Sequence, residues 1–279
     1  MGAEIVVKQA EGDKKSKVKS QKSNSDSRLR GANSEETSPS TRFPTPDSRS
    51  KEEKISVIIP TLNEVRTIQQ TLASTRSGTN VEVIVADGGS QDDTVTIASA
   101  WGAKVLFVPK GRAKQMNLGA AAATGEILLF LHADTRLPLK FDTMVRAALL
   151  QPRAIAGAFS LQIDSPLSSL RLIEWGVNWR SRLLQMPYGD QAIFLKSSVF
   201  HHLGKFPELP MMEGFELMCQ LRRKGRIVIL PTPVLTSPRR WLKQGVCQTT
   251  LKNQIAILSY LLGISPEKIA CWYRGRDKL

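Results

Sequence analysis

From residue 55 onwards, short apolar runs alternate with longer segments of mixed polarity. Short runs rich in β-branched residues are typical of strands covered on both faces. The predicted strands of the first half are residues 55–60, 81–86, 104–108 and 127–131. Because helical segments lie between them, the sequence predicts an α/β fold with a mostly parallel central sheet, whose ligands bind at the carboxyl ends of the strands.

Polar residues between these strands mark the expected helix starts. Residues 61–64, Thr-Leu-Asn-Glu, have the spacing of a capping box that opens a helix to about Arg76. Ser90 with Asp93 is expected to cap the next helix, and residues 114–123 are predicted to form an alanine-rich third helix.

The second half of the chain is less regular. Its predicted strands are residues 157–163, 191–195 and 227–230. Its predicted helices are residues 167–184, 216–224 and 247–262, followed by a helix that starts at Ser265-Pro266.

The first 53 residues are polar and contain few large apolar side chains. Such a segment cannot bury enough surface to offset its ordering entropy, so we predict a disordered polar tail at residues 1–53. Residues 54–279 are expected to form one domain. Its expected parts are a first half at 54–136, a second half at 137–241 and a helical segment at 242–279.

The chain of 279 residues carries 39 Lys and Arg against 25 Asp and Glu, a formal charge of +14. Such a charge suits nucleic acid, an anionic membrane or a small substrate such as a nucleotide diphosphate. The basic residues are spread along the chain, and neither zinc-finger spacing nor an aromatic RNA-binding motif is present. We therefore expect no nucleic acid partner, and the oligomeric state stays open.

Three widely spaced cysteines, Cys219, Cys247 and Cys271, favour neither a disulfide framework nor a metal site. With no secretory signal at residues 1–30, this indicates a cytoplasmic protein. Peripheral contact with the inner face of a membrane is a further option. It would involve the basic residues Arg239, Arg240, Lys243, Lys252, Lys268, Arg274, Arg276 and Lys278.

Three polar clusters directly follow predicted strands. They are Asn63-Glu64, Asp87-Gly88-Gly89 and His132-Ala133-Asp134. In a parallel sheet these strand ends share one edge, so the clusters are expected to surround a single crevice.

No glycine-rich phosphate loop follows any of the strands, which argues against a dinucleotide dehydrogenase or a P-loop enzyme. If a nucleotide binds, a divalent cation such as Mn²⁺ or Mg²⁺ is expected to neutralise its phosphates. Asp134 is the preferred ligand, with Lys110, Arg112 and Lys114 adding positive charge nearby.

Residues 56–64, 87–94 and 131–135 resemble the family 2 glycosyltransferases of the GT-A fold, over about residues 54–275. Residues 111–117, 188–191, 206–213 and 237–241 resemble, more narrowly, the arsenosugar-biosynthesis-type bacterial subgroup. The resemblance implies a Rossmann-like three-layer sandwich, in which residues 54–136 are the nucleotide-sugar-binding half and residues 137–241 the acceptor-side half. It also implies metal-dependent, inverting transfer of a sugar from a nucleotide-sugar, expected to be UDP-linked, to an acceptor hydroxyl.

The resemblance also implies roles for single residues. Asp134 would bind the metal, with His132 as a second ligand, and Asp87 and Glu64 would hold the base and ribose. The expected donor-binding residues are Pro60, Asn63, Glu64, Asp87, Gly88, Arg112, Gln115, His132, Ala133, Asp134, Arg239, Arg240 and Trp241.

Gly214 departs from the family pattern, because relatives carry at this position the Asp that acts as general base. Glycine cannot accept a proton, so Glu213, Asp190 or Glu216 would have to substitute, and Glu213 is the preferred candidate. Two alternatives to an active glycosyltransferase stay open. The chain is a catalytically impaired relative that binds a nucleotide-sugar, or it is a nucleotidyltransferase with a related sheet.

Overall fold

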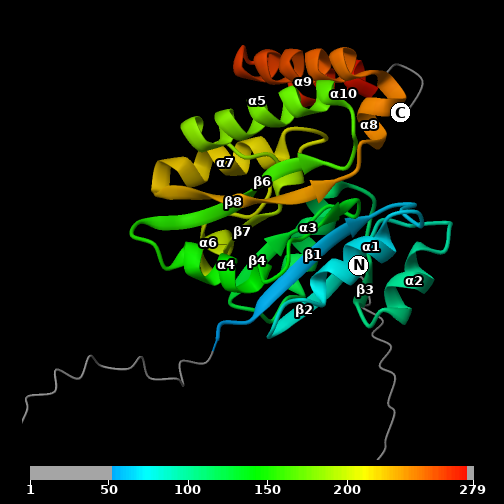
Figure 1. Cartoon of the computed structure of the whole chain (residues 1–279), viewed down its shortest axis with the longest axis vertical. Helices are drawn as coiled ribbons and strands as arrows, with labels where there is room; N and C mark the ends of the chain where they lie inside the picture. The colour runs from blue at the N-terminus through cyan, green and yellow to red at the C-terminus, as the bar shows by residue number, and fades with distance from the viewer. Residues whose placement is uncertain (1–51, 275–279) are drawn as a thin grey trace, which may run out of the picture. The chain divides into compact units, whose positions relative to one another are not determined.

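An eight-stranded sheet lies at the centre of residues 52–274, the part of the chain that the computed structural model describes (Figure 1). The strand order is β3-β2-β1-β4-β7-β6-β8-β5. Strands β1, β2, β3 and β4 are parallel to one another, and so are β6 and β8. Strands β5 and β7 run antiparallel to their neighbours. The strands are β1 (Ile55–Thr61), β2 (Val81–Asp87), β3 (Lys104–Phe107), β4 (Ile127–Phe130), β5 (Thr135–Arg136), β6 (Ala154–Ile163), β7 (Ile193–Lys196) and β8 (Arg226–Thr236).

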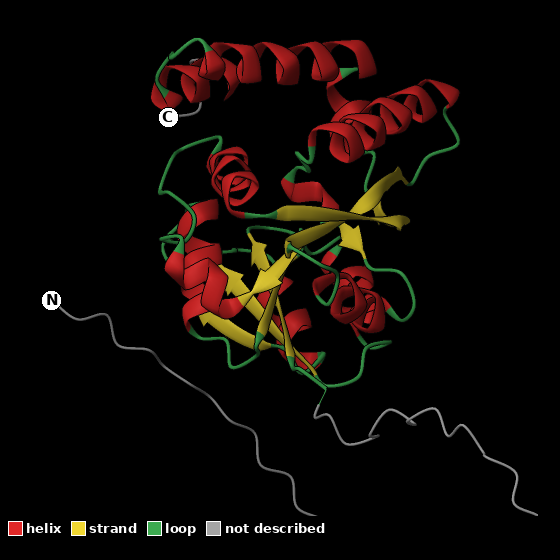
Figure 2. Ribbon diagram, turned by 90° about the vertical axis from the view of Figure 1, so that its left-hand side faces the viewer, coloured by secondary structure: helices red, strands yellow, loops and turns green. Residues whose placement is uncertain are grey.

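Helices flank the sheet on both sides (Figure 2). Among the described residues, no helix combines the length and apolar character needed to cross a membrane. The α-helices are α1 (Ile68–Thr75), α2 (Thr94–Ala100), α3 (Arg112–Ala121), α4 (Phe141–Leu149), α5 (Ser168–Leu184), α6 (Ser197–His202), α7 (Glu213–Lys224), α8 (Arg239–Gln244), α9 (Val246–Leu261) and α10 (Pro266–Arg274), and a 3₁₀ helix, η1, spans Gly189–Gln191.

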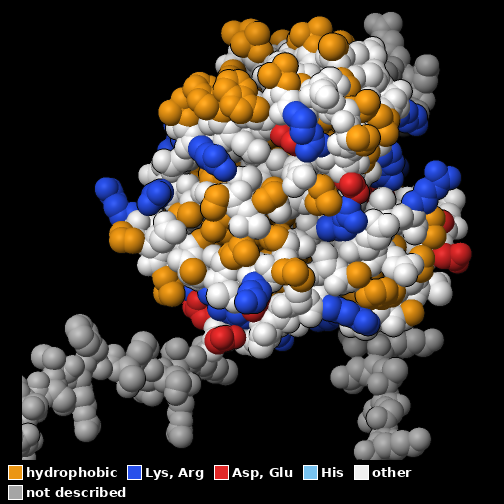
Figure 3. Space-filling model, in the orientation of Figure 1, with side chains coloured by type: hydrophobic (Ala, Val, Ile, Leu, Met, Phe, Trp, Pro, Cys, Tyr) orange, Lys and Arg blue, Asp and Glu red, His pale blue; other side chains and the backbone are white. Residues whose placement is uncertain are grey.

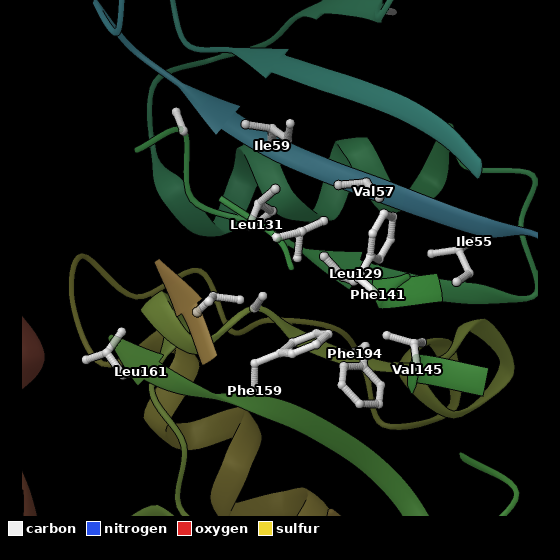
Figure 4. Close-up of a cluster of buried hydrophobic side chains, with 14 of the residues drawn as sticks. Ile55, Val57, Ile59, Leu129, Leu131, Phe141, Val145, Phe159, Leu161 and Phe194 are labelled. Atoms are coloured by element: carbon white, nitrogen blue, oxygen red, sulfur yellow. The ribbon is translucent and has the colours of Figure 1, made fainter. Parts of the chain in front are cut away.

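Alternation along the central strands divides the core into two layers. On β1, Val57 and Ile59 pack with α1 and α4, whereas Ile58 packs with α3 on the opposite face. Figure 4 shows the first layer, where side chains of β1 and β4 meet Phe159 and Phe194 from β6 and β7. Because successive strand residues point to opposite faces, fully apolar strands are buried on both sides. The predicted three-layer α/β arrangement is confirmed.

Most predicted elements are present, with shifted ends, but two predicted caps are wrong. Thr61 is the last residue of β1, and helix α1 begins only at Ile68. Ser90 does not cap α2, because its hydroxyl donates to Asp87 instead. The segments after β1 and β2 bond to each other instead. The Asn63 amide donates to the Ser90 hydroxyl, and the Gln91 amide donates to the Asn63 side chain. These bonds replace the predicted local caps.

The predicted disordered tail, residues 1–53, lies outside the described residues except for its last two, and it stays a prediction.

Candidate active site

A pocket of about 230 Å³ opens where β1 and β4 end. One side of its wall comes from the ends of these two strands, and the other side comes from η1, α7, α8 and α9. Eight of the predicted site residues line it: Pro60, Arg112, His132, Asp134, Asp190, Glu213, Arg240 and Trp241. The fold therefore brings residues from both halves of the chain to one cavity.

Asp134 and Glu64 are held together by Arg239. The Arg239 guanidinium donates to Glu64 Oε1 at 2.9 Å and to Asp134 Oδ2 at 3.5 Å. Burial raises the pKa of the Asp134 carboxyl, and the Glu64 carboxylate raises it further, while Arg239 and Arg240 oppose this. Two carboxylates around one positive charge form a set of oxygen donors that suits a hard divalent cation.

His132 lines the same pocket two residues before Asp134. Burial lowers its pKa well below the ordinary value, and the charges of Arg112 and Arg240 lower it further. A neutral imidazole can act as a metal ligand or a hydrogen-bond acceptor. Within residues 52–274, however, no three His, Cys, Asp or Glu side chains are grouped as a metal site.

Gly189 lies against the His132 ring. A Cβ added at Gly189 would sit 3.0 Å from His132 Nε2. Any larger residue at position 189 would therefore displace the ring, so the glycine keeps His132 in its place in the wall.

Asp87 organises the edge of the sheet next to the pocket. Its buried carboxylate accepts hydrogen bonds from the Thr61 hydroxyl, the backbone amides of Gly89 and Ser90, and the Ser90 hydroxyl. A carboxylate offers about four acceptor positions. Because protein groups occupy these positions, Asp87 fixes the loop. A direct hydrogen bond from a nucleobase to Asp87 would require one of these bonds to break.

Asn63 and Glu64 are fixed by the same loop. Asn63 has a left-handed backbone, with φ of 55°, and its amide donates to the Ser90 hydroxyl at 2.8 Å. Its side chain accepts from the Gln91 amide, and the Glu64 amide donates to the Thr94 hydroxyl. The segments after β1 and β2 thus form one rigid unit beside the pocket.

Gln115, Gly88 and Ala133 support this edge from within. The buried Gln115 amide donates to the carbonyls of Thr61 and Ala86 at 2.7 and 2.9 Å, which clips the ends of β1 and β2 together. A Cβ on Gly88 would lie 3.1 Å from that amide. The Ala133 carbonyl accepts from the Thr71 hydroxyl. These predicted donor-binding residues therefore position the loops.

The three predicted acid–base candidates have different surroundings. Asp190 Oδ1 is buried without a hydrogen-bond partner, and burial raises the pKa of this carboxyl. Glu213 begins α7 and has one weak ionic contact, 4.0 Å from Arg112. Glu216 bonds the hydroxyl of Tyr260 and is absent from the pocket wall. The structure therefore brings Asp190 and Glu213 to the cavity and leaves Glu216 outside.

Gly214 also lines the pocket, between Glu213 and Phe215. A Cβ added at Gly214 would have no atom within 4 Å. The position where the family resemblance implies a general base thus has room for a side chain.

Trp241 and Arg240 close one end of the cavity. The Trp241 ring is buried, and its indole Nε1 has no hydrogen-bond partner. Arg240 is exposed, while its charge acts on Asp134, Asp190 and His132.

Sequence reasoning missed two features of the site. Arg180 of α5 lies over the Tyr188 ring, 3.5 Å from its centre, and its charge opposes the raised pKa of Asp190. No sequence spacing links these residues. The other missed part is the inner face of α9, where Asn253, Ala256 and Ile257 line the pocket. Their helical i, i+3, i+4 spacing was an available signal.

Comparison with known proteins identifies the family. The sequence profile described as Glycosyl transferase family 2 matches residues 56–202, slightly more than half of the chain. The chain belongs to glycosyltransferase family 2. The match runs from β1 to α6, so it includes the sheet edge where Glu64, Asp87 and Asp134 lie. The narrower subgroup resemblance stays a prediction.

Curated relatives match part of the chain, and one of them is named as a glycosyltransferase. A PGL/p-HBAD biosynthesis glycosyltransferase of Mycobacterium bovis is 37% identical over 102 residues, 33% of this chain and 40% of that relative. A TPR repeat-containing protein of Synechococcus elongatus is 36% identical over 105 residues, 37% of this chain and 26% of that relative. The chain thus spans less than half the length of each of these relatives.

Solved structures confirm the predicted GT-A fold. A mannosyltransferase from Pyrobaculum calidifontis in complex with GDP-Man and Mn²⁺ has a TM-score of 0.53 at 22% identity, covering 67% of this chain and 57% of that one. Glucosyl-3-phosphoglycerate synthase from Mycobacterium tuberculosis, with Mn²⁺, UDP and phosphoglyceric acid, has a TM-score of 0.51 at 21% identity. That likeness covers 76% of this chain and 79% of that one.

Proposed function

We propose that this enzyme transfers a sugar from a nucleotide-sugar to an acceptor hydroxyl, with inversion at the anomeric carbon. One observation carries the proposal: Asp134, in the segment after β4, shares a single cavity with Asp190, whose carboxylate oxygen Oδ1 is buried without a hydrogen-bond partner. A charge-binding group and a proton acceptor are the two parts that such a displacement needs.

The donor would bind across the ends of β1, β2 and β4. The fixed loops that carry Asn63 and Glu64 support the nucleoside, and Arg239 and Arg240 meet the diphosphate. A divalent cation, Mn²⁺ or Mg²⁺, held by Asp134 with His132 or Glu64 beside it, would supply further positive charge to the leaving group. UDP is the preferred nucleotide, since the glucosyl-3-phosphoglycerate synthase structure contains UDP, and GDP is the alternative.

Asp190 is the proposed general base. Its free carboxylate oxygen removes the proton of the acceptor hydroxyl, and the hydroxyl oxygen attacks the anomeric carbon. The bond from that carbon to the diphosphate breaks, and its electron pair leaves with the nucleoside diphosphate. Glu213, preferred from the sequence, is second, because Arg112 already lies 4.0 Å from it.

The acceptor would lie against the apolar part of the wall. This part is formed by Met116, Phe206, Met211, Met212, Phe215 and Ile257. Apolar surfaces bind apolar ligand surfaces. We therefore propose an acceptor whose hydroxyl is attached to an apolar body.

The second candidate function, binding without transfer, is favoured by Gly214 at the family's base position. A panel of UDP- and GDP-linked sugars, incubated with Mn²⁺ or Mg²⁺, separates the two by release of the nucleoside diphosphate. Turnover of any one donor supports transferase chemistry. Binding of a donor with no turnover, by hydrolysis or transfer, supports the impaired relative.

A further inference from the structure

Helix α5 has an apolar face that points away from the core. Its residues Leu172, Trp175, Trp179 and Leu183 recur at helical spacing and are 69, 66, 56 and 61% exposed. The opposite face of the helix carries the buried side chains Leu170, Glu174 and Ser181. The Trp175 and Trp179 rings stack on each other, with centroids 6.5 Å apart. Helix α5 is thus apolar on its outer face, although an ordinary surface helix is polar there.

Helix α9 has the same property. Leu251, Ile255, Leu258 and Leu262 follow an i, i+4, i+7, i+11 pattern and are all exposed. The opposite face of this helix lines the active-site pocket through Asn253, Ala256 and Ile257. The inner face therefore serves the site, and the outer face has no partner among the described residues.

The two faces belong to one surface region. Helices α5 and α9 are in contact, and Figure 3 shows apolar side chains gathered over both. Eighteen large apolar side chains are exposed within residues 52–274; six of these lie between 167 and 184, and eight lie between 242 and 272. Exposed apolar surface on this scale marks an interaction site.

The charges on helices α5, α8 and α9 are mostly of one sign. Helices α5, α8 and α9 contain seven basic residues and a single acidic one, Glu174, which is buried and paired with Arg171. The basic residues are Arg171, Arg180, Arg182, Arg239, Arg240, Lys243 and Lys252, but no charged group interrupts the exposed apolar positions. A second copy of the same face would be repelled by this charge, whereas an anionic surface would be attracted.

We propose that the outer face of α5 and α9 docks onto the surface of an anionic lipid bilayer. Exposed Trp and Leu side chains would enter the boundary between headgroups and acyl chains. Arg182, Lys243 and Lys252, which do not line the pocket, would contact lipid phosphates. From the sequence, this contact was expected from the basic residues of the C-terminal region alone. The structure assigns it instead to an apolar face with basic flanks. The proposal does not depend on which donor or acceptor the pocket binds.

Co-sedimentation of the full chain with vesicles tests this proposal. We expect binding to vesicles of phosphatidylcholine mixed equally with phosphatidylglycerol, weaker binding at higher salt, and little binding to phosphatidylcholine alone. Trp175→Ser combined with Trp179→Ser should weaken binding about tenfold or more. The matched control is Leu139→Ser combined with Leu150→Ser, which removes two side chains that are each 79% exposed elsewhere, and it should bind normally.

Circular dichroism melting of each variant checks that it is folded, and brominated lipids should quench the tryptophan fluorescence of the bound native chain. Equal loss of binding in both double variants would overturn the proposal, as would no binding by the native chain. Sedimentation equilibrium tests whether a second copy of the chain covers this face instead. If the native chain is a dimer and the Trp175/Trp179 double variant is a monomer, the face serves self-association. A failure here leaves donor turnover unaffected, so it is distinguishable from a failure of the proposed function.

Discussion

The carboxylates around the pocket differ most in what surrounds them. Asp190 is faced by Arg180 of α5, Arg240 of α8 and Asp134 after β4, and its raised pKa comes first from burial. A base whose pKa lies closer to the working pH removes a proton more effectively. Asp190→Asn should therefore lower kcat by about 10²–10⁴-fold with the donor affinity retained. Rate measurements with calorimetric donor binding would check this.

The pH dependence of that activity has a defined sign. Only the ionised form of Asp190 accepts a proton, so kcat/KM should fall as the pH decreases through the raised pKa. The free energy of unfolding has the opposite pH dependence. The folded state holds this proton more tightly than the unfolded state, so the free energy of unfolding decreases as the pH rises. Asp190→Asn should thus keep or raise the Tm at neutral pH. A lowered Tm with unchanged kcat would show that Asp190 is structural.

Gly214 offers a gain-of-function prediction. Since an added Cβ meets nothing within 4 Å, Gly214→Asp should fold and place a carboxylate in the pocket near the start of α7. If Asp190 and Glu213 replace the family base poorly, turnover should rise by about 10²-fold. Gly176→Asp, also helical with open space around it, is the control and should leave turnover unchanged. An unaltered rate in Gly214→Asp would mean that the native chain already has an efficient base.

For single residues, the sequence predicted which side chains meet at the pocket, but not what each one contacts there. Asp134, His132 and Glu213 lie at the pocket as expected. The acceptor positions of Asp87 are filled in part by the Thr61 hydroxyl, which is distant in sequence. The charges that face Asp190 come from α5 and α8, and no local sequence pattern reveals these neighbours.

Strand β1 is packed closely against the turn before β4. A Cβ on Gly125 would lie 2.7 Å from the Lys54 carbonyl and 2.8 Å from the Ser56 amide, both backbone atoms. Gly125→Ala should therefore destabilise the fold by about 1–3 kcal/mol. Gly176→Ala, in open space on α5, should stabilise it by about 0.5–1 kcal/mol. Urea denaturation of the two variants checks the difference, and equal midpoints would contradict this account of the packing.

Elements with a strong apolar pattern were predictable, and those set by contacts between segments were not. Strands β1, β2 and β4 follow from their buried runs, and α5 and α9 follow from their length. The six residues between β1 and α1 resemble a helix start in isolation. In the fold they bond to the loop after β2, and therefore they stay irregular.

For the molecule as a whole, the order of strands and helices predicted the layered α/β sheet, and the family profile confirmed the glycosyltransferase assignment. The antiparallel insertion of β7 between β4 and β6 was not predicted, because a short apolar run does not reveal its neighbours. This insertion brings η1, with Asp190, against the end of β4. The acceptor side of the pocket thus depends on sheet topology.

The central claim is that a nucleoside diphosphate and a divalent cation bind at Asp134, and thermal unfolding tests it most directly. UDP with Mn²⁺ at about 100 times its dissociation constant should stabilise the native chain by about 2.7 kcal/mol. Asp134→Asn should lose this stabilisation, and Asp164→Asn, which changes an exposed carboxylate paired with Arg136, should keep it. Full stabilisation of Asp134→Asn by UDP and Mn²⁺, or no stabilisation of the native chain by UDP or GDP with either cation, would contradict the account.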